Sequence, residues 1–155
     1  MAATPAPRLS AGYAGIATRG VALTIDAAIV NVTVLIGGAL LGLVASLAAS
    51  LRPHWLVGAT GATGWALAVI AYFSYFWVAG GQTPGMRLMR IRVLTRDDAP
   101  LRLPRAIWRT LALGLAIVPC FAGFAPVLVD ARRRGLHDML AGTVVVHVPP
   151  EVQPR

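Results

Sequence analysis

The sequence predicts an all-α, multi-pass membrane protein, a helical bundle with two full spans and a broken third hydrophobic segment. Composition supports this class, because 57% of the 155 residues are hydrophobic and only 13% are charged. Ordinary soluble domains carry about 25% charged residues, and the mean hydropathy here is +0.69. A chain this short has too little interior to hide so much apolar surface from water, which disfavours a soluble enzyme.

The first two hydrophobic stretches are long enough to cross a bilayer, since a spanning helix needs about 20 mostly apolar residues. The first covers residues 20–51, with Asp26 as its only charge, and the second covers residues 55–79, with no charge. A straight helix over the first stretch would be roughly 48 Å long, more than a bilayer core of about 30 Å needs. We therefore expect it to tilt, to project, or to break at Gly37–Gly38.

The third hydrophobic stretch covers residues 106–129 and is interrupted by Arg109, Pro119 and Gly123. Proline inside a helix removes a hydrogen bond and collides with the preceding turn. We therefore expect two short helices, at about residues 104–118 and 124–130, that form a hairpin and return to the side they came from. One plain third span is the alternative.

The segment between the second and third stretches is basic and begins with a turn-forming cluster at residues 80–85. The alternation that follows, over residues 86–94, is typical of a short strand or an interfacial helix. Near the end of the chain, residues 142–148 are β-branched, so we expect a strand there that pairs with residues 89–94. Residues 13–148 are expected to form one transmembrane domain between disordered ends, at residues 1–12 and 149–155.

The basic residues predict the orientation. All 14 are arginine, and the formal net charge is +8. Arginine concentrates in cytoplasmic loops, so the N-terminus and the second loop are expected in the cytoplasm, and a hairpin would place 13 of the 14 there. Six arginines in two groups are expected to set the topology or to bind anionic lipid, which attracts each arginine by about 1 kcal/mol. They are Arg87, Arg90, Arg92, Arg132, Arg133 and Arg134.

Asp26 is the most informative single residue, because a carboxylate inside a span is costly and marks a function by default. It is either a protonatable site on a cation or proton path, or a structural group bound to a hydroxyl or an arginine. Arg19 lies seven residues earlier on the same helical face. Asp138 is the best cytoplasmic candidate to pair with Arg19.

Small residues recur every four positions at Gly38, Gly42 and Ser46, which is typical of a helix-packing face, within the chain or with a partner subunit. The sequence contains no nucleophile, phosphate-loop or dinucleotide motif, and its histidines lack metal-ligand spacing. We therefore expect no catalysis, no cofactor and no metal. The hydrophobicity points to membrane lipids and other membrane subunits, or self-association, as partners, and not to nucleic acid.

Two motifs extend the pattern formed by Arg19 and Asp26. G-Q-T-P-G-M-R-L occupies residues 81–88, and D-A-R-R-R-G-L-H-D-M-L-A-G-T occupies residues 130–143. With them, the chain resembles the RDD family of small bacterial membrane proteins over nearly its whole length. The resemblance implies that Arg19, Asp26 and Asp138 are the arginine and two aspartates of the name, with Asp130 as the rival for the last.

The same resemblance implies an integral protein of the bacterial inner (plasma) membrane. Family members are associated with ligand transport, with sodium/proton exchange, or with accessory positions in larger systems, including lipid uptake. We expect a non-catalytic accessory or partner-binding subunit of a membrane transport system. The alternative is a cation/proton exchanger that uses Asp26.

Overall fold

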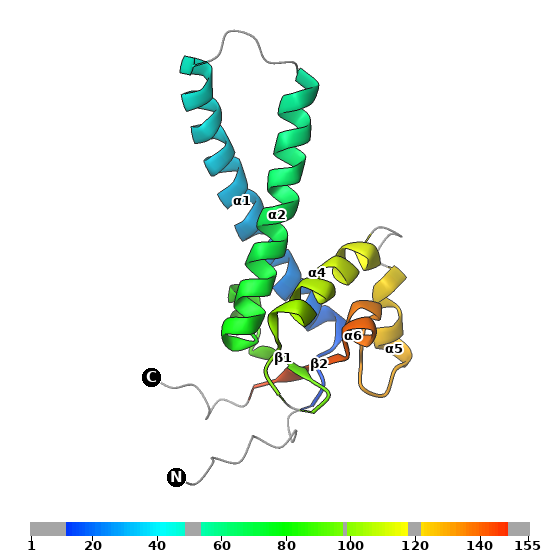
Figure 1. The fold of residues 1–155 in the computed structure, drawn as a ribbon. Helices are drawn as coiled ribbons and strands as arrows, with labels where there is room; N and C mark the ends of the chain where they lie inside the picture. Colours follow the sequence, from blue (N-terminus) through cyan, green and yellow to red (C-terminus); the bar gives the residue numbers. More distant parts are fainter. Residues whose placement is uncertain (1–11, 49–53, 98, 118–121, 149–155) are drawn as a thin grey trace.

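The computed structural model describes residues 12–48, 54–97, 99–117 and 122–148. It is mostly helical, and two long helices dominate its shape: α1 (Ile16–Ala48) and α2 (His54–Gly80). They run antiparallel, lie together at one end and diverge toward the other (Figure 1). Both are long and apolar enough to cross a membrane, over Ile16–Val44 and Gly58–Gly80. These are the two long hydrophobic stretches that the sequence predicted.

Helix α1 does not break at Gly37–Gly38, which was one of three alternatives for its excess length, but continues to Ala48. A Cβ atom added to either glycine would meet nothing within 4 Å, so no neighbouring element bends the helix there. In apolar surroundings a helix keeps all its backbone hydrogen bonds internal, which favours continuity over a break. The excess length is therefore taken up without an interruption.

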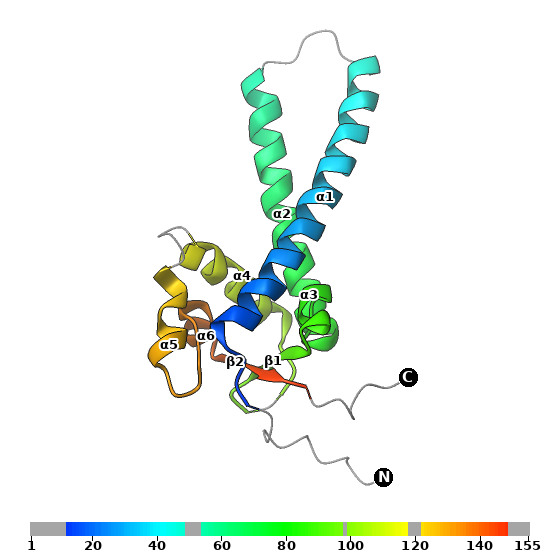
Figure 2. The ribbon, with the colours of Figure 1, turned by 180° about the vertical axis from the view of Figure 1, so that it is seen from behind.

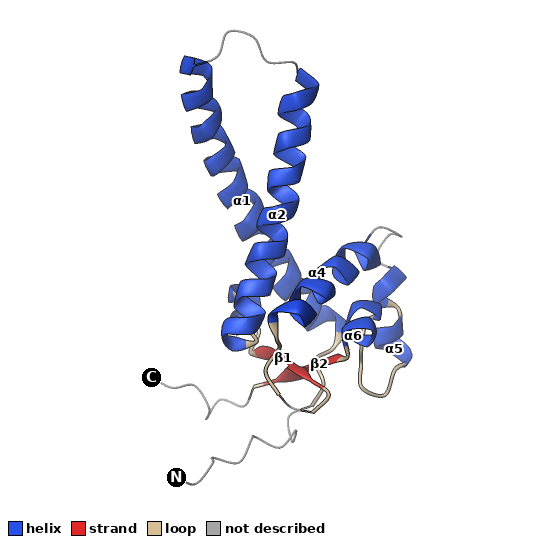
Figure 3. Ribbon diagram, viewed as in Figure 1, coloured by secondary structure: helices blue, strands red, loops and turns tan. Residues whose placement is uncertain are grey.

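The remaining elements pack around the lower ends of α1 and α2, as the two opposite views show (Figures 1 and 2). They are α3 (Pro84–Leu88), β1 (Ile91–Thr95), α4 (Leu103–Ile117), the 3-10 turn η1 (Ala122–Phe124), α5 (Pro126–Val129), α6 (Leu136–Ala141) and β2 (Thr143–His147). The two strands form an antiparallel sheet below the helices, with Val93 opposite Val145 (Figure 3). A strand was expected at residues 142–148, and either a strand or an interfacial helix at residues 89–94.

The described residues contain no single helix over 106–129. Helix α4 ends at Ile117, residues 118–121 lie outside the described residues, and η1 and α5 follow. Residues Ala106, Arg109, Leu113 and Ala116 recur at helical spacing and are buried, while Leu111 and Leu115 on the other side are exposed. An amphipathic helix of this kind packs along one face. Helix α4 contacts α2 and α6 and lies across the base of the α1–α2 pair (Figure 1).

The turn between α2 and α3 is determined by local chemistry. Gly81 has φ +68°, and a Cβ atom there would lie 2.8 Å from the carbonyl oxygen of Val93. Thr83 caps α3 by accepting a hydrogen bond from the backbone N–H of Met86 at 3.2 Å, and Pro84 occupies the first helical position. This turn places α3 directly against α1.

The chain ends were expected to be disordered, at residues 1–12 and 149–155. Apart from Gly12, these residues lie outside the described residues.

Candidate functional site

The carboxylate of Asp26 on α1 is fully buried and fastens that helix to α2 and to α3. It accepts hydrogen bonds from the Tyr72 hydroxyl on α2 at 2.9 Å and from the Gly85 backbone N–H on α3 at 2.8 Å. The hydroxyl of Thr83 donates a third. An ionised carboxylate only accepts hydrogen bonds, and all three of these neighbours donate. Asp26 therefore acts as a tie between α1, α2 and α3.

Gly85 allows this tie to form. A Cβ atom at this position would collide with the carbonyl oxygen of Ala22 and lie 2.9 Å from the Asp26 carboxyl carbon. Only glycine lets the backbone of α3 approach α1 this closely. In the T-P-G segment, the threonine supplies a hydroxyl and a helix cap, the proline starts the helix, and the glycine exposes its N–H.

A second buried carboxylate, Asp138 on α6, joins three helices. The Nη1 group of Arg19 on α1 donates to its Oδ2, and the Nη2 group of Arg109 on α4 donates to its Oδ1 at 2.5 Å. The backbone N–H of Gly135 donates to Oδ2 at 3.1 Å. Burial disfavours the charged form of Asp138, but the charges of Arg109 and Arg19 outweigh this and hold its pKa below the usual range.

Arg109 is 2% exposed and is held from two further sides. Its Nε donates to the Thr143 hydroxyl at 3.2 Å, and its guanidinium carbon lies 4.1 Å from the centre of the Trp77 ring. Burial lowers the pKa of Arg109, while Asp138 opposes that shift. An arginine starts from so high a pKa that it stays charged, so the cluster contains two cations for one anion.

His137 lies beside this cluster and is 3% exposed. Burial lowers its pKa to about 4, so its ring is neutral near pH 7. Four buried polar atoms of this region have no hydrogen-bond partner among the described residues: Arg19 Nη2, Trp77 Nε1, Arg109 Nη1 and His137 Nδ1. With Asp26, these residues line a cavity of about 30 Å³, whose size and polarity suit a single water molecule.

The structure therefore joins Arg19 to Asp138, the pairing that sequence considerations favoured. It does not join Arg19 to Asp26, because the two side chains reach different elements from one side of α1. Asp26 and Asp138 form separate ties that border one small cavity. The rival residue Asp130 lies in the loop before α6, where hydrogen bonds from Arg134, one of them at 2.8 Å, hold its pKa below the usual range.

The sequence did not predict the other partners of these two carboxylates. Arg109 interrupts an apolar stretch, and a charge in such a place signals a buried counter-charge, but nothing in the sequence indicates which one. The donors Tyr72, Thr83 and Gly85 carried no comparable signal, because they are ordinary in an aromatic-rich helix end and in a turn.

The other candidate residues lie apart from these ties. Arg87, Arg90, Arg132 and Arg133 are exposed, and Arg92 and Arg134 are partly buried. On α1, Gly38 and Gly42 would meet nothing within 4 Å if they carried a Cβ atom, and the Ser46 hydroxyl donates to the carbonyl of Leu43. Packing of this face within the chain, one of the two alternatives, is not found among the described residues. The described residues also hold no group of three or more metal-ligating side chains.

Comparison with known proteins connects this geometry to a family. The sequence matches the RDD family over residues 13–142, which includes both buried carboxylates. The chain belongs to the RDD family. This RDD family membrane protein is also 32% identical over 84 residues to the human protein FAM8A1, an alignment that covers 45% of this chain and 20% of that protein.

The chain thus spans about a fifth of the length of this curated relative. No solved structure matches the chain. This relative is human, and a bacterial source is a prediction from the family resemblance alone.

Proposed function

We propose that this RDD protein is a non-catalytic accessory subunit that binds other membrane-protein subunits of a transport system. The observation that supports this is the burial and hydrogen bonding of Asp26. A carboxylate on an ion path must exchange partners, whereas Asp26 is 0% exposed and held by three donors from two other segments. Its placement favours a structural role that keeps the two spans and α3 in one arrangement.

The outer part of α1, around residues 35–46, supports a partner-binding role. Gly38 and Gly42 lie on a helix face with no described neighbour, and Leu35 and Leu41 nearby are each 73% exposed. Small residues four apart let a second helix approach closely in a membrane. A helix of another subunit is the proposed occupant, and self-association is the competing one.

We further propose that the protein lies in a bacterial inner (plasma) membrane with its N-terminus in the cytoplasm. The α3–β2 module lies at the same end as the start of α1 (Figure 1), and among the 14 arginines only Arg52 falls between the two long helices. Reporters fused after Val148 and within residues 87–105 should both read cytoplasmic. Opposite readings would mean that the third hydrophobic segment is one plain span.

The partner-binding proposal is tested by copurification after mild detergent extraction. Wild-type protein should bring down a defined set of transporter subunits, and Gly42→Leu should lose them, because a leucine there prevents close approach. Gly61→Leu on α2 is the matched control, since a Cβ atom there also meets nothing within 4 Å. A lone homo-oligomer from wild-type extracts, or equal recovery from Gly42→Leu, would contradict the proposal.

The competing function, cation/proton exchange through Asp26, is tested in vesicles that contain the purified protein. Exchange predicts that added cations dissipate a pH gradient with wild-type protein and not with Asp26→Asn. Asparagine cannot titrate but keeps nearly the same shape. Such a result, with the variant still folded, would overturn the accessory proposal. Absence of wild-type activity with common cations would rule out the exchange function.

A further inference from the structure

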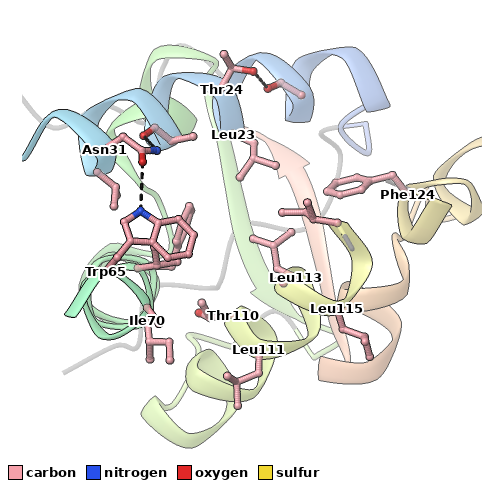
Figure 4. A pocket seen from close by; sticks show the side chains of 18 of the residues that line it. Leu23, Thr24, Asn31, Trp65, Ile70, Thr110, Leu111, Leu113, Leu115 and Phe124 are labelled. Atoms are coloured by element: carbon pink, nitrogen blue, oxygen red, sulfur yellow. Dashed lines mark hydrogen bonds between the residues drawn. The ribbon is translucent and has the colours of Figure 1, made fainter. Parts of the chain in front are cut away.

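A large apolar cavity of about 800 Å³ lies between α1, α2 and α4 (Figure 4). Leu23 and Val30 line it from α1, Trp65 and Val69 from α2, and Leu113 and Gly114 from α4. In Figure 4 the side chains of Leu23 and Leu113 extend into it from opposite sides. We call this space the apolar groove.

The polar side chains that line the apolar groove have their hydrogen bonds satisfied. The Trp65 indole N–H donates to the Asn31 side-chain oxygen at 3.2 Å, as the dashed line in Figure 4 shows. The hydroxyls of Thr24 and Thr110 donate to carbonyl oxygens one turn earlier in their own helices, at 2.9 Å and 3.1 Å. Because these groups are already paired, the apolar groove presents hydrocarbon to an occupant.

The length and volume of the apolar groove suit one hydrocarbon chain. The groove follows α1 from Ile16 to Asn31, a rise of roughly 22 Å. Its volume of about 800 Å³ is within the range of about 300–1,000 Å³ found for small-ligand sites.

An arginine lies close to one end of the apolar groove. Arg133 is exposed, and its Nη1 lies 3.4 Å from the position that a Cβ atom would have on Gly15, next to Ile16 at the groove end. The backbone of Arg133 has φ 48°, an uncommon conformation outside glycine, and its N–H donates to the Asp130 carbonyl at 2.9 Å. This loop therefore holds a cation beside the start of α1, next to the groove end.

We propose that the apolar groove binds one acyl chain of an anionic phospholipid, with the headgroup phosphate on Arg133. The site is apolar along its length and cationic at one end, which is the complement of such a lipid. It lies beside the two membrane-spanning helices, where lipid chains are the surrounding medium. This binding is independent of the accessory role, which depends on the outer part of α1.

The test counts bound lipid by native mass spectrometry after detergent-solubilised full-length protein is exchanged into micelles with phosphatidylglycerol or phosphatidylcholine. Wild-type protein should retain one phosphatidylglycerol per chain. Gly114→Leu and Gly20→Leu place a side chain in the groove, and a Cβ atom at either site meets nothing within 4 Å, so both variants should fold. Displacing a few methylene groups should lower occupancy by about tenfold or more.

The matched control is Gly61→Leu, which makes the same substitution on α2 outside the groove and should retain lipid like wild type. For the headgroup, Arg133→Gln should reduce the preference for phosphatidylglycerol over phosphatidylcholine by about fivefold. Arg132→Gln changes the neighbouring exposed arginine and should not.

The proposal is wrong if wild-type protein retains no phosphatidylglycerol, or if both groove variants retain as much as Gly61→Leu. It is also overturned if Gly114→Leu releases a second protein chain while lipid occupancy stays unchanged, because the groove then receives protein. Equal recovery of partner subunits from wild type and Gly42→Leu, with lipid still bound by wild type, would contradict the accessory proposal and leave this inference standing, so the two proposals fail separately.

Discussion

Replacing Asp138 by asparagine should destabilise this RDD protein more than any other single change of similar size. The carboxylate is 0% exposed and is the anion shared by Arg19, which is 6% exposed, and Arg109, which is 2% exposed. Asparagine preserves the shape but removes the charge. It also puts an amide N–H group where one carboxylate oxygen accepted a hydrogen bond from an N–H donor.

The magnitude follows from the two cations that remain. Breaking a buried ion pair by removing one partner costs about 3–5 kcal/mol, because the other charge is left unpaired. In a protein of this size, each kcal/mol shifts the melting temperature by roughly 2–4 °C. Asp138→Asn should therefore lower the melting temperature by roughly 6–20 °C.

The assay is thermal unfolding in one detergent, followed by tryptophan fluorescence. Asp130→Asn is the matched control, because Asp130 pairs with Arg134 at 2.8 Å in a loop where both side chains are partly exposed. It should lower the melting temperature by clearly less than Asp138→Asn does, because solvent partly screens this pair. The double variant Asp138→Asn with Arg109→Met removes one of the stranded cations and should recover about 1–3 kcal/mol of the loss.

Two results would refute this reasoning. A melting temperature for Asp138→Asn within a few degrees of wild type would mean that the two arginines do not depend on this carboxylate. A double variant with no recovery would mean that the lost stability came from the shape of the α6 turn and not from charge.

Three further predictions concern the same region. Gly85→Ala should lower the free energy of unfolding by about 1–3 kcal/mol, because the new Cβ atom collides with the Ala22 carbonyl. Thr83→Val should cost about 1–3 kcal/mol, because it removes the hydroxyl that donates to Asp26 and caps α3. Burial lowers the pKa of His137 from 6.5 to about 4, so the unfolded chain binds more protons between these values, and stability should fall by about 3 kcal/mol as the pH drops through this window.

Conservative variants separate these effects from general damage. Gly80→Ala should be tolerated, since its Cβ atom would lie 3.8 Å from the Arg87 guanidinium, and Thr83→Ser keeps the hydroxyl. His137→Gln should flatten the stability profile between pH 6.5 and 4. Equal stability of Gly85→Ala and Gly80→Ala, equal loss in Thr83→Ser and Thr83→Val, or an unchanged pH profile in His137→Gln would contradict the respective prediction.

The sequence by itself determined the membrane class, the two long helices and the family. Hydropathy and length are summed along a continuous segment, so residues 20–51 and 55–79 are readable as spans without knowledge of their neighbours. The β-branched run near the end of the chain was readable as a strand for the same local reason. The motifs at residues 81–88 and 130–143 carried the family resemblance.

Tertiary structure alone decided what the buried charges do. Arg19 and Asp138 are 119 residues apart, and Arg109 joins them only because α4 crosses the base of the spans. Likewise, the three donors to Asp26 meet it because Gly85 lets α3 approach α1. Which groups lie within hydrogen-bonding distance depends on the packing of whole helices, and this information is absent from the periodicity and composition of any one segment.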